Sequence, residues 1–166
     1  MKKRLGELIA MIKEKSEPWG CDSAHDLTYK LYRNAGGYQI LMRHTWHRRV
    51  PFDERLRVYS SPATPIQRQR SESEERLIAC DPGRAENALK NLSKAKISMM
   101  PESTKALSGF EGATILTVSS ECAQVTYKWL REFPPRGWEP LTEFVKTILA
   151  EVEQKVGRQE AVDVRN

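Results

Sequence analysis

The sequence feature that most constrains the fold is a β-hairpin pattern in residues 26–47. The stretch "DLTYKLYR" alternates strictly, with Leu27, Tyr29 and Leu31 on one side of the predicted strand. The following "NAGG" at 34–37 contains asparagine and glycine residues, which accept positive φ and favour a tight turn. The stretch "YQILMRHTW" then returns as a second strand. The pattern therefore predicts an antiparallel sheet as the framework of the protein.

The N-terminal residues 1–16 show a different apolar spacing. Leu5, Leu8, Ile9 and Ile12 recur as on one side of a helix and are interleaved with charged residues. The spacing predicts an amphipathic helix rather than the continuous apolar segment of a secretory signal. We therefore expect a cytoplasmic protein.

The remaining segments predict further strands and helices in turn. "RLRVYS" (55–60) predicts a third strand, and residues 60–75, rich in serine and proline, predict an exposed loop. Asp81 before Pro82 is typical of an N-cap and predicts that a second helix begins there. Residues 112–130 predict another hairpin, and "PPRGW" predicts the turn that follows it. The helical repeat from Leu141 to Val152 predicts the last helix, followed by a frayed tail at 157–166.

These elements follow one another in the order α-β-β-β-α-β-β-α. Strands joined as hairpins predict an α+β fold in which about five antiparallel strands pack against three helices on one face. A chain of 166 residues is long enough to bury its own core, so residues 1–156 are predicted to form a single domain. Trp129 and Trp138 are expected in that core, because Trp129 is in phase with Tyr127 and Trp138 precedes an apolar helix.

The C-terminal third resembles a group of small uncharacterised bacterial proteins. The resemblance covers about residues 107–152, "GFEGATILTV…VTYKWLREFPPRGWEPLTEFVKTIL". It consists of a glycine turn, a strand that ends in Tyr-x-Trp, a proline-rich corner with tryptophan, and a closing helix. It implies a bacterial origin and an association with toxin-immunity and defence proteins. It assigns no active-site residue.

The residues that could carry chemistry do not form a recognisable catalytic or metal-binding motif. Cys21, Cys80 and Cys122 give an odd count without a C-x-x-C pair, which indicates reduced thiols rather than disulfides or a zinc site. His44 and His47 are three residues apart on a strand, so their side chains point to opposite faces. Nucleotide-binding and nucleophile motifs are missing from the sequence. We therefore expect no enzyme, no cofactor, no metal and no small-molecule substrate.

The charge distribution gives the clearest indication of binding. The net charge is +5, and residues 1–70 hold 14 Lys/Arg against 7 Asp/Glu. On the returning strand, Arg43 and His47 share the face opposite the apolar residues from Tyr38 to Trp46. Arg55 and Arg57 of the next predicted strand are expected on that same face. The predicted partner-binding residues are Arg43, His47, Arg48, Arg49, Arg55, Arg57, Arg68 and Arg70.

Two functions remain open from the sequence. The first is a non-catalytic bacterial interaction protein, such as an immunity protein, an inhibitor or an accessory subunit of a defence complex, whose basic sheet face docks an acidic protein. The second is a nucleic-acid-binding module that uses the same arginine-rich face, although no helix-turn-helix or other nucleic-acid-binding signature is visible. No membrane partner is expected, because no apolar run reaches the roughly 18 residues of a membrane span.

Overall fold

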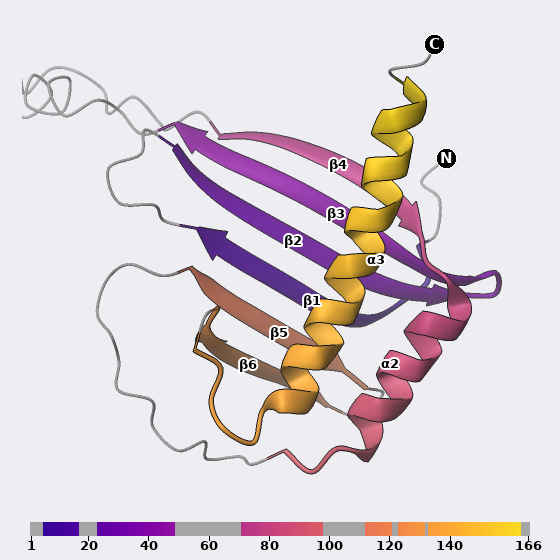
Figure 1. Cartoon of the computed structure of the whole chain (residues 1–166), viewed down its shortest axis with the longest axis vertical. Helices are drawn as coiled ribbons and strands as arrows, with labels where there is room; N and C mark the ends of the chain where they lie inside the picture. Colours follow the sequence, from indigo (N-terminus) through magenta and orange to yellow (C-terminus); the bar gives the residue numbers. More distant parts are fainter. Residues whose placement is uncertain are drawn as a thin grey trace, which may run out of the picture.

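The computed structural model describes residues 5–16, 23–48, 71–97, 112–120, 123–131 and 133–163, which form an α+β fold. One sheet packs against two helices (Figure 1). The strands are β1 (Glu7–Ser16), β2 (Ser23–Asn34), β3 (Gly37–Arg48), β4 (Ser71–Ala79), β5 (Ala113–Ser119) and β6 (Gln124–Leu130). The helices are α2 (Pro82–Lys94) and α3 (Glu139–Asp163). The predicted fold class is confirmed, but the described residues hold six strands and two helices instead of five and three.

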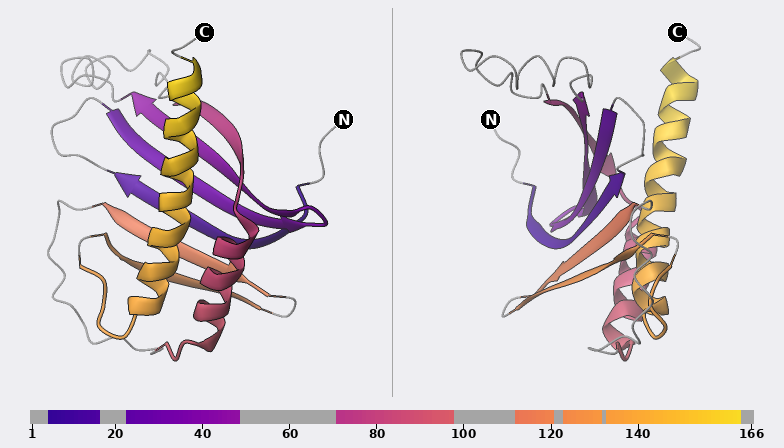
Figure 2. Two further views of the ribbon diagram at one scale, coloured as in Figure 1. Left: turned by 45° about the vertical axis from the view of Figure 1, so that its right-hand side comes forward. Right: turned by 90° about the vertical axis from the view of Figure 1, so that its left-hand side faces the viewer.

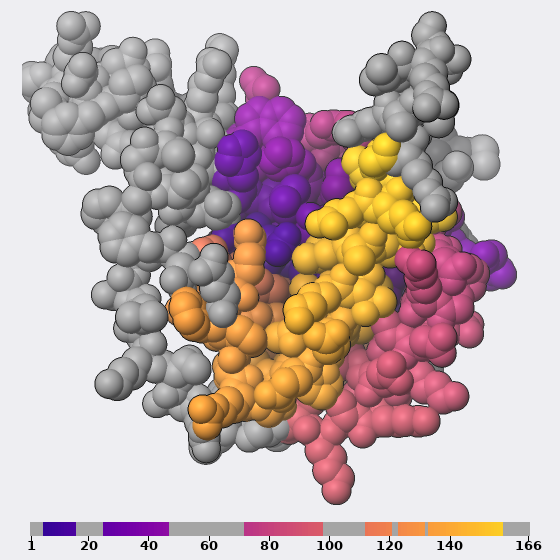
Figure 3. Space-filling model, in the orientation of Figure 1, coloured from indigo at the N-terminus to yellow at the C-terminus, as the bar shows by residue number. Residues whose placement is uncertain are grey.

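All neighbouring strands of the sheet are antiparallel, in the order β4-β3-β2-β1-β5-β6. Both helices lie against the same face of this twisted sheet, and α3 runs diagonally across it (Figure 2). Figure 3 shows this covered side, with α3 as a ridge flanked by α2. Within the described part of the chain, no helix or strand lies against the opposite face, which we call the open face.

The N-terminal segment forms a strand at Glu7–Ser16, so the prediction of a helix was wrong for these residues. β1 occupies a central position and pairs with β2 on one side and β5 on the other. The register shifts between Leu8 and Ala10, which leaves Ile9 in a bulge. This extra residue interrupts the alternation of a strand and places apolar residues at a spacing that imitates a helix. After the bulge, Ala10 and Ile12 alternate inward and are fully buried.

The segment that pairs with β3 also differs from the prediction. β4 includes residues 71–75, which we expected in the exposed loop at 60–75. Its serine and glutamate residues carry no apolar signal because β4 is an edge strand and most of its side chains are exposed. The predicted strand at 55–60 and the rest of the predicted loop lie outside the described residues.

The two predicted hairpins are confirmed. Asn34 pairs with Gly37 across a turn formed by Ala35 and Gly36, and the N–H of Gly36 donates to the Asn34 side chain at 2.9 Å. Gly37 has φ of +117°, which explains why glycine stands there. β5 and β6 form the second hairpin, with Leu116 opposite Tyr127.

The core lies between the covered face of the sheet and the two helices. Ile12, Leu31, Ile40 and Leu116 from the central strands are almost completely buried against residues such as Leu141 of α3. Trp129 and Trp138 are buried as predicted, with their rings edge to face at 6.0 Å between centroids. α3 continues to Asp163, through most of the segment 157–166 that we expected to fray.

The predicted start of α2 is also confirmed. The Asp81 side chain accepts a hydrogen bond from the N–H of Arg84 at 2.8 Å, with Pro82 in the first turn. The N–H of Asp81 itself donates to Glu151 of α3 at 3.0 Å. The N-terminus of α2 is therefore capped by Asp81 and also hydrogen-bonded to α3.

Candidate interaction surface

The open face of the sheet is predominantly basic. Strand alternation places on it every second side chain, opposite in phase to the buried Ile12, Leu31 and Ile40. The described basic residues of the open face lie on four strands: Lys13, Lys15, Lys30, Arg43 and Lys128. The acidic residues described on the same face are Asp26 and Glu75. The face therefore carries an excess of positive charge that no described element covers.

The basic residues form neighbouring rows across the strands. Lys13 lies opposite Thr28, and Thr28 lies opposite Arg43, so these three residues form one row. In the other direction Lys13 lies opposite Ile115, which is opposite Lys128. Lys30 occupies the adjacent row, opposite Met11 and Leu41, within diagonal reach of Lys13 and Arg43. A partner that binds the centre of the sheet would contact several of these cations together.

The structure places only part of the predicted site. Arg43 is exposed on the open face, as we expected. His47 and Arg48 belong to the end of β3, but their side chains lie outside the described residues. The other predicted arginines, Arg49, Arg55, Arg57, Arg68 and Arg70, also lie outside the described residues. The location of the site on a sheet face thus rests on Arg43 and on lysines that the prediction omitted.

The omitted lysines lie on other strands than Arg43. The sequence pattern did not show that their side chains share a face of the sheet with Arg43. Lys13 and Lys15 were assigned to a helix, although the alternation from Ala10 to Lys15 was the signal that could have placed them. Lys30 follows the alternation of β2, opposite in phase to Tyr29 and Leu31. Its proximity to Arg43 depends on the hairpin register, and its proximity to Lys13 depends on the pairing of β1 with β2.

Arg43 is partly neutralised by the neighbouring strand. Its Nε donates to Oε1 of Glu75 at 2.6 Å, and the two side chains also form an ion pair. Both side chains are about half exposed, so this pair contributes little to stability, on the order of 0–1 kcal/mol. The positive charge described at the centre of the open face therefore comes mainly from Lys13 and Lys30, while the other arginines of the predicted site lie outside the described side chains.

Apolar side chains accompany the cations on the open face. Leu41, Met11 and Ile115 are only partly buried, and Leu77 on edge strand β4 is 42% exposed. Tyr32 is the one aromatic residue on the described part of this face. The open face therefore combines cations with partly exposed apolar side chains, whereas single-stranded nucleic acids are bound on several aromatic side chains.

A histidine pair lies on the covered side of the sheet, near one end of β2 and β3. His25 Nδ1 and His44 Nε2 are 3.1 Å apart and share a hydrogen bond, and the His44 ring meets Trp46 edge to face. Such a bond requires that one of the two ring nitrogens carries no proton. No group of three metal-binding side chains occurs in the described part of the chain.

A buried carboxylate joins the two helices. Glu151 of α3 is 4% exposed and accepts from the Asp81 N–H and, at 3.1 Å, from Nη1 of Arg84. Next to it, burial raises the pKa of the Cys80 thiol to about 12, with a further contribution from Glu151. Cys80 therefore remains protonated at neutral pH and is a poor nucleophile. Glu151 therefore connects α2 with α3 through hydrogen bonds from Asp81 and Arg84.

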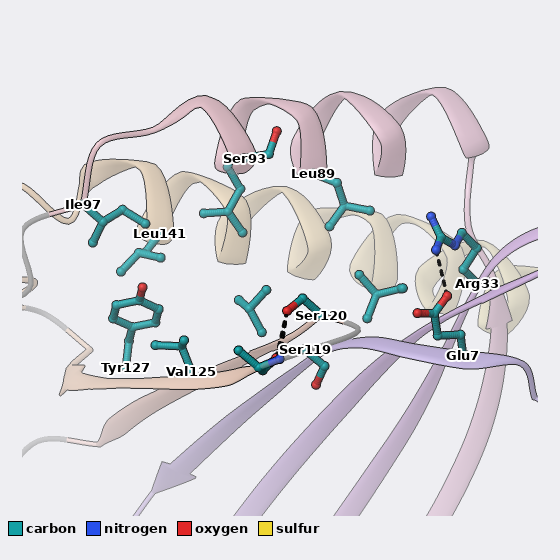
Figure 4. Close-up of a pocket in the computed structure, with 14 residues that line it drawn as sticks. Glu7, Arg33, Leu89, Ser93, Ile97, Ser119, Ser120, Val125, Tyr127 and Leu141 are labelled. Atoms are coloured by element: carbon teal, nitrogen blue, oxygen red, sulfur yellow. Dashed lines mark hydrogen bonds and ion pairs between the residues drawn. The ribbon is translucent and has the colours of Figure 1, made fainter.

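The described residues also enclose a groove of about 490 Å³ between α2 and the ends of strands β1, β5 and β6. Its walls are mostly aliphatic, including Leu89, Val118 and Val125. Figure 4 shows the ion pair between Arg33 and Glu7 at one end of the groove and Tyr127 at the other. The Arg33 cation is thus already paired, at 2.7 Å, with a carboxylate of this chain.

Comparison with known proteins gives no match to a protein-family model, a curated protein or a solved structure. In the part of the chain that the structure describes, no helix is both long enough and apolar enough to span a membrane.

Proposed function

We propose that the protein is a non-catalytic interaction protein that binds an acidic protein through the open face of its sheet. The observation that supports this most directly is the cluster of Lys13, Lys30 and Arg43 on a broad sheet face without a described cover. Cations on an exposed face attract a negatively charged partner and accelerate its association. The partly exposed apolar residues between them supply the contact area that a stable complex needs.

The proposal includes a bacterial inhibitor, immunity protein or accessory subunit acting in the cytoplasm. The bacterial setting is carried over from the sequence pattern of residues 107–152, and the reducing compartment from the odd cysteine count without a C-x-x-C pair. Nucleic acid is the second candidate because it is also an anionic partner. The open face favours it less, because Tyr32 is the single aromatic side chain described there.

Affinity purification from cells of the source organism, with and without nuclease, tests the proposal. We expect an acidic protein that stays bound after nuclease treatment, identified by mass spectrometry. Raising the salt concentration should weaken its binding, mostly through a slower association rate.

Nucleic acid would give a different result in the same experiment. The eluate would absorb as nucleic acid and lose its bound material after nuclease treatment. Binding to duplex DNA would then fall with salt with a log–log slope of about −0.9 for each phosphate neutralised. That outcome would replace the protein partner with the second candidate.

A further inference from the structure

Among the described strands, none lies beside the outer edge of β6. The N–H of Arg131 donates to the carbonyl of Gly112 at 2.9 Å, and the N–H of Ser120 donates to the carbonyl of Ala123 at 2.8 Å. Because hydrogen-bonded positions alternate along an antiparallel pair, Val125, Tyr127 and Trp129 bond to β5. The N–H and C=O groups of Gln124, Thr126 and Lys128 consequently point away from β5, and they have no backbone partner among the described residues.

The two edges of the sheet are protected very differently. Edge strand β4 carries Glu72, Glu74, Glu75 and Arg76, and ion pairs link Arg76 to Glu74 and Arg43 to Glu75. Charged side chains of this kind discourage pairing with another strand. β6 carries one charged residue, Lys128, between Gln124 and Leu130. The β6 edge is therefore the one that can accept an additional strand.

Exposed apolar side chains gather at the same edge. Val125 is 46% exposed on β6, and Phe133, which bridges to Leu130 just after β6, is 43% exposed. They are two of the three large apolar side chains that are strongly exposed in the described residues. In Figures 1 and 2 the corner from β6 to α3 and the C-terminal end of α2 extend past β6. A strand added beside β6 would therefore place one of its sides beneath this helical layer.

The other side of an added strand would meet positive charge. Lys128 points to the open face, in the row that continues through Ile115 to Lys13. Strands β5 and β6 contain no acidic residue that could neutralise it. An acidic side chain directly across from Lys128 would form a favourable cross-strand pair. The edge thus matches a strand with apolar residues toward the helices and acidic residues toward the open face.

We propose that an extended segment of the acidic partner adds to the sheet beside β6. Its backbone bonds to Gln124, Thr126 and Lys128, and its alternate side chains are apolar and acidic. This inference rests on the proposed function, because it names the way in which the acidic partner is held. In this form of recognition, main-chain hydrogen bonds provide affinity and the alternate side chains provide specificity.

A defined peptide tests the edge without knowledge of the partner. The probe is a blocked, labelled synthetic peptide that alternates valine and glutamate over the length of β6, and its control alternates valine and lysine. We expect fluorescence anisotropy to show binding of the glutamate peptide only. Amide hydrogen exchange should slow at Thr126 and Lys128 when that peptide binds. Absence of binding, or binding without this protection, would overturn the proposal.

Two proline variants provide the matched comparison. Thr126→Pro removes an outward N–H of β6, and Ser73→Pro removes the equivalent outward N–H of β4, since Cys80 and alternate residues before it bond to β3. Thr126→Pro should weaken the glutamate peptide about tenfold or more, and Ser73→Pro should not. Should Thr126→Pro fail to fold, Lys128→Glu replaces it: it should weaken the glutamate peptide and strengthen the lysine peptide. Equal binding of the glutamate peptide to the tested β6 variant and the wild type would overturn the proposal.

Light scattering and partner capture separate the remaining possibilities. A wild-type dimer that Thr126→Pro converts to a monomer would show that a second copy occupies the edge, and would overturn the proposal. If Thr126→Pro captures the cellular partner normally while reversal of Lys13, Lys30 and Arg43 abolishes capture, the proposed function stands and strand addition is wrong. If neither variant loses the partner, the proposed function itself fails.

Discussion

At the scale of single residues, two buried or constrained groups report on the fold most directly. Tyr29 lies on the covered side of β2, where burial and the nearby Glu14 raise its pKa to about 12. Gly6 precedes β1 with φ of +97°, and an added Cβ there would lie 2.2 Å from the carbonyl oxygen of Arg33. Both observations give stability predictions with a definite sign.

The raised pKa of Tyr29 predicts a loss of stability in alkali. The phenol is neutral in the fold up to about pH 12 but ionises near pH 10 when unfolded, so unfolding becomes easier as the pH rises between these values. The difference corresponds to about 2–3 kcal/mol. Tyr29→Phe should flatten this part of the pH dependence in urea unfolding, although Cys80 contributes a similar slope. An unchanged slope would show that Tyr29 does not titrate with the fold.

Two glycines predict opposite effects of the same substitution. Gly6→Ala should lower the free energy of unfolding by about 2 kcal/mol or more, because alanine strains the backbone and collides with Arg33. Gly157→Ala should raise it by about 0.5–1 kcal/mol, because Gly157 lies in α3 with no heavy atom within 4 Å of an added Cβ. Thermal or urea unfolding measures both. Equal effects of the two variants would contradict the placement of Gly6 against β2.

At the scale of elements, one buried carboxylate, Glu151, connects α2 with α3. Glu151→Ala removes the acceptor of the Asp81 N–H and leaves that donor in a partly buried position. We expect the free energy of unfolding to fall by about 1–3 kcal/mol, the cost of a buried donor without a partner. The exposed Glu153 on the same helix is the control, and Glu153→Ala should change it by about 0.5 kcal/mol or less. Chemical denaturation of both variants makes the comparison; similar losses would show that the Glu151 contacts do not stabilise the helix pair.

Elements with local signals were predicted well. The hairpin of β2 and β3 followed from alternation and the "NAGG" turn, and the start of α2 followed from Asp81 and Pro82. The strand β1 was missed because a bulge at Ile9 placed apolar residues at helical spacing. Its extended conformation is stabilised by pairing with β2 and β5, which the local sequence does not show. β4 was missed because an exposed edge strand needs few apolar residues.

The candidate site was harder to predict than the elements. Arg43 could be assigned to the outer side of the hairpin from alternation alone. Lys30 lies near Arg43 through the hairpin register, but Lys13 and Lys128 join the same face only through the strand order, which places β1 between β2 and β5. Such non-local pairing leaves no pattern within a single segment, so the centre of the open face could not be located from the sequence.

At the scale of the whole molecule, the sheet has one face packed on two helices and one face without a described cover. The covered face holds the core, and the open face holds five described cations against two described carboxylates, with apolar side chains between them. This asymmetry is the basis for proposing an acidic protein partner. The β6 edge lies at one border of the open face, so a single partner could contact both surfaces.

The most direct measurement compares partner capture by two variants with the same charge change on different faces. One variant carries Lys13→Glu and Lys30→Glu on the open face. The other carries Lys90→Glu and Lys146→Glu at exposed positions of α2 and α3. Circular dichroism first confirms that both are folded.

We predict that wild type and the helix variant capture the same acidic protein from cells of the source organism, while the open-face variant loses it. Equal capture by all three folded proteins would contradict binding of the partner through the open face.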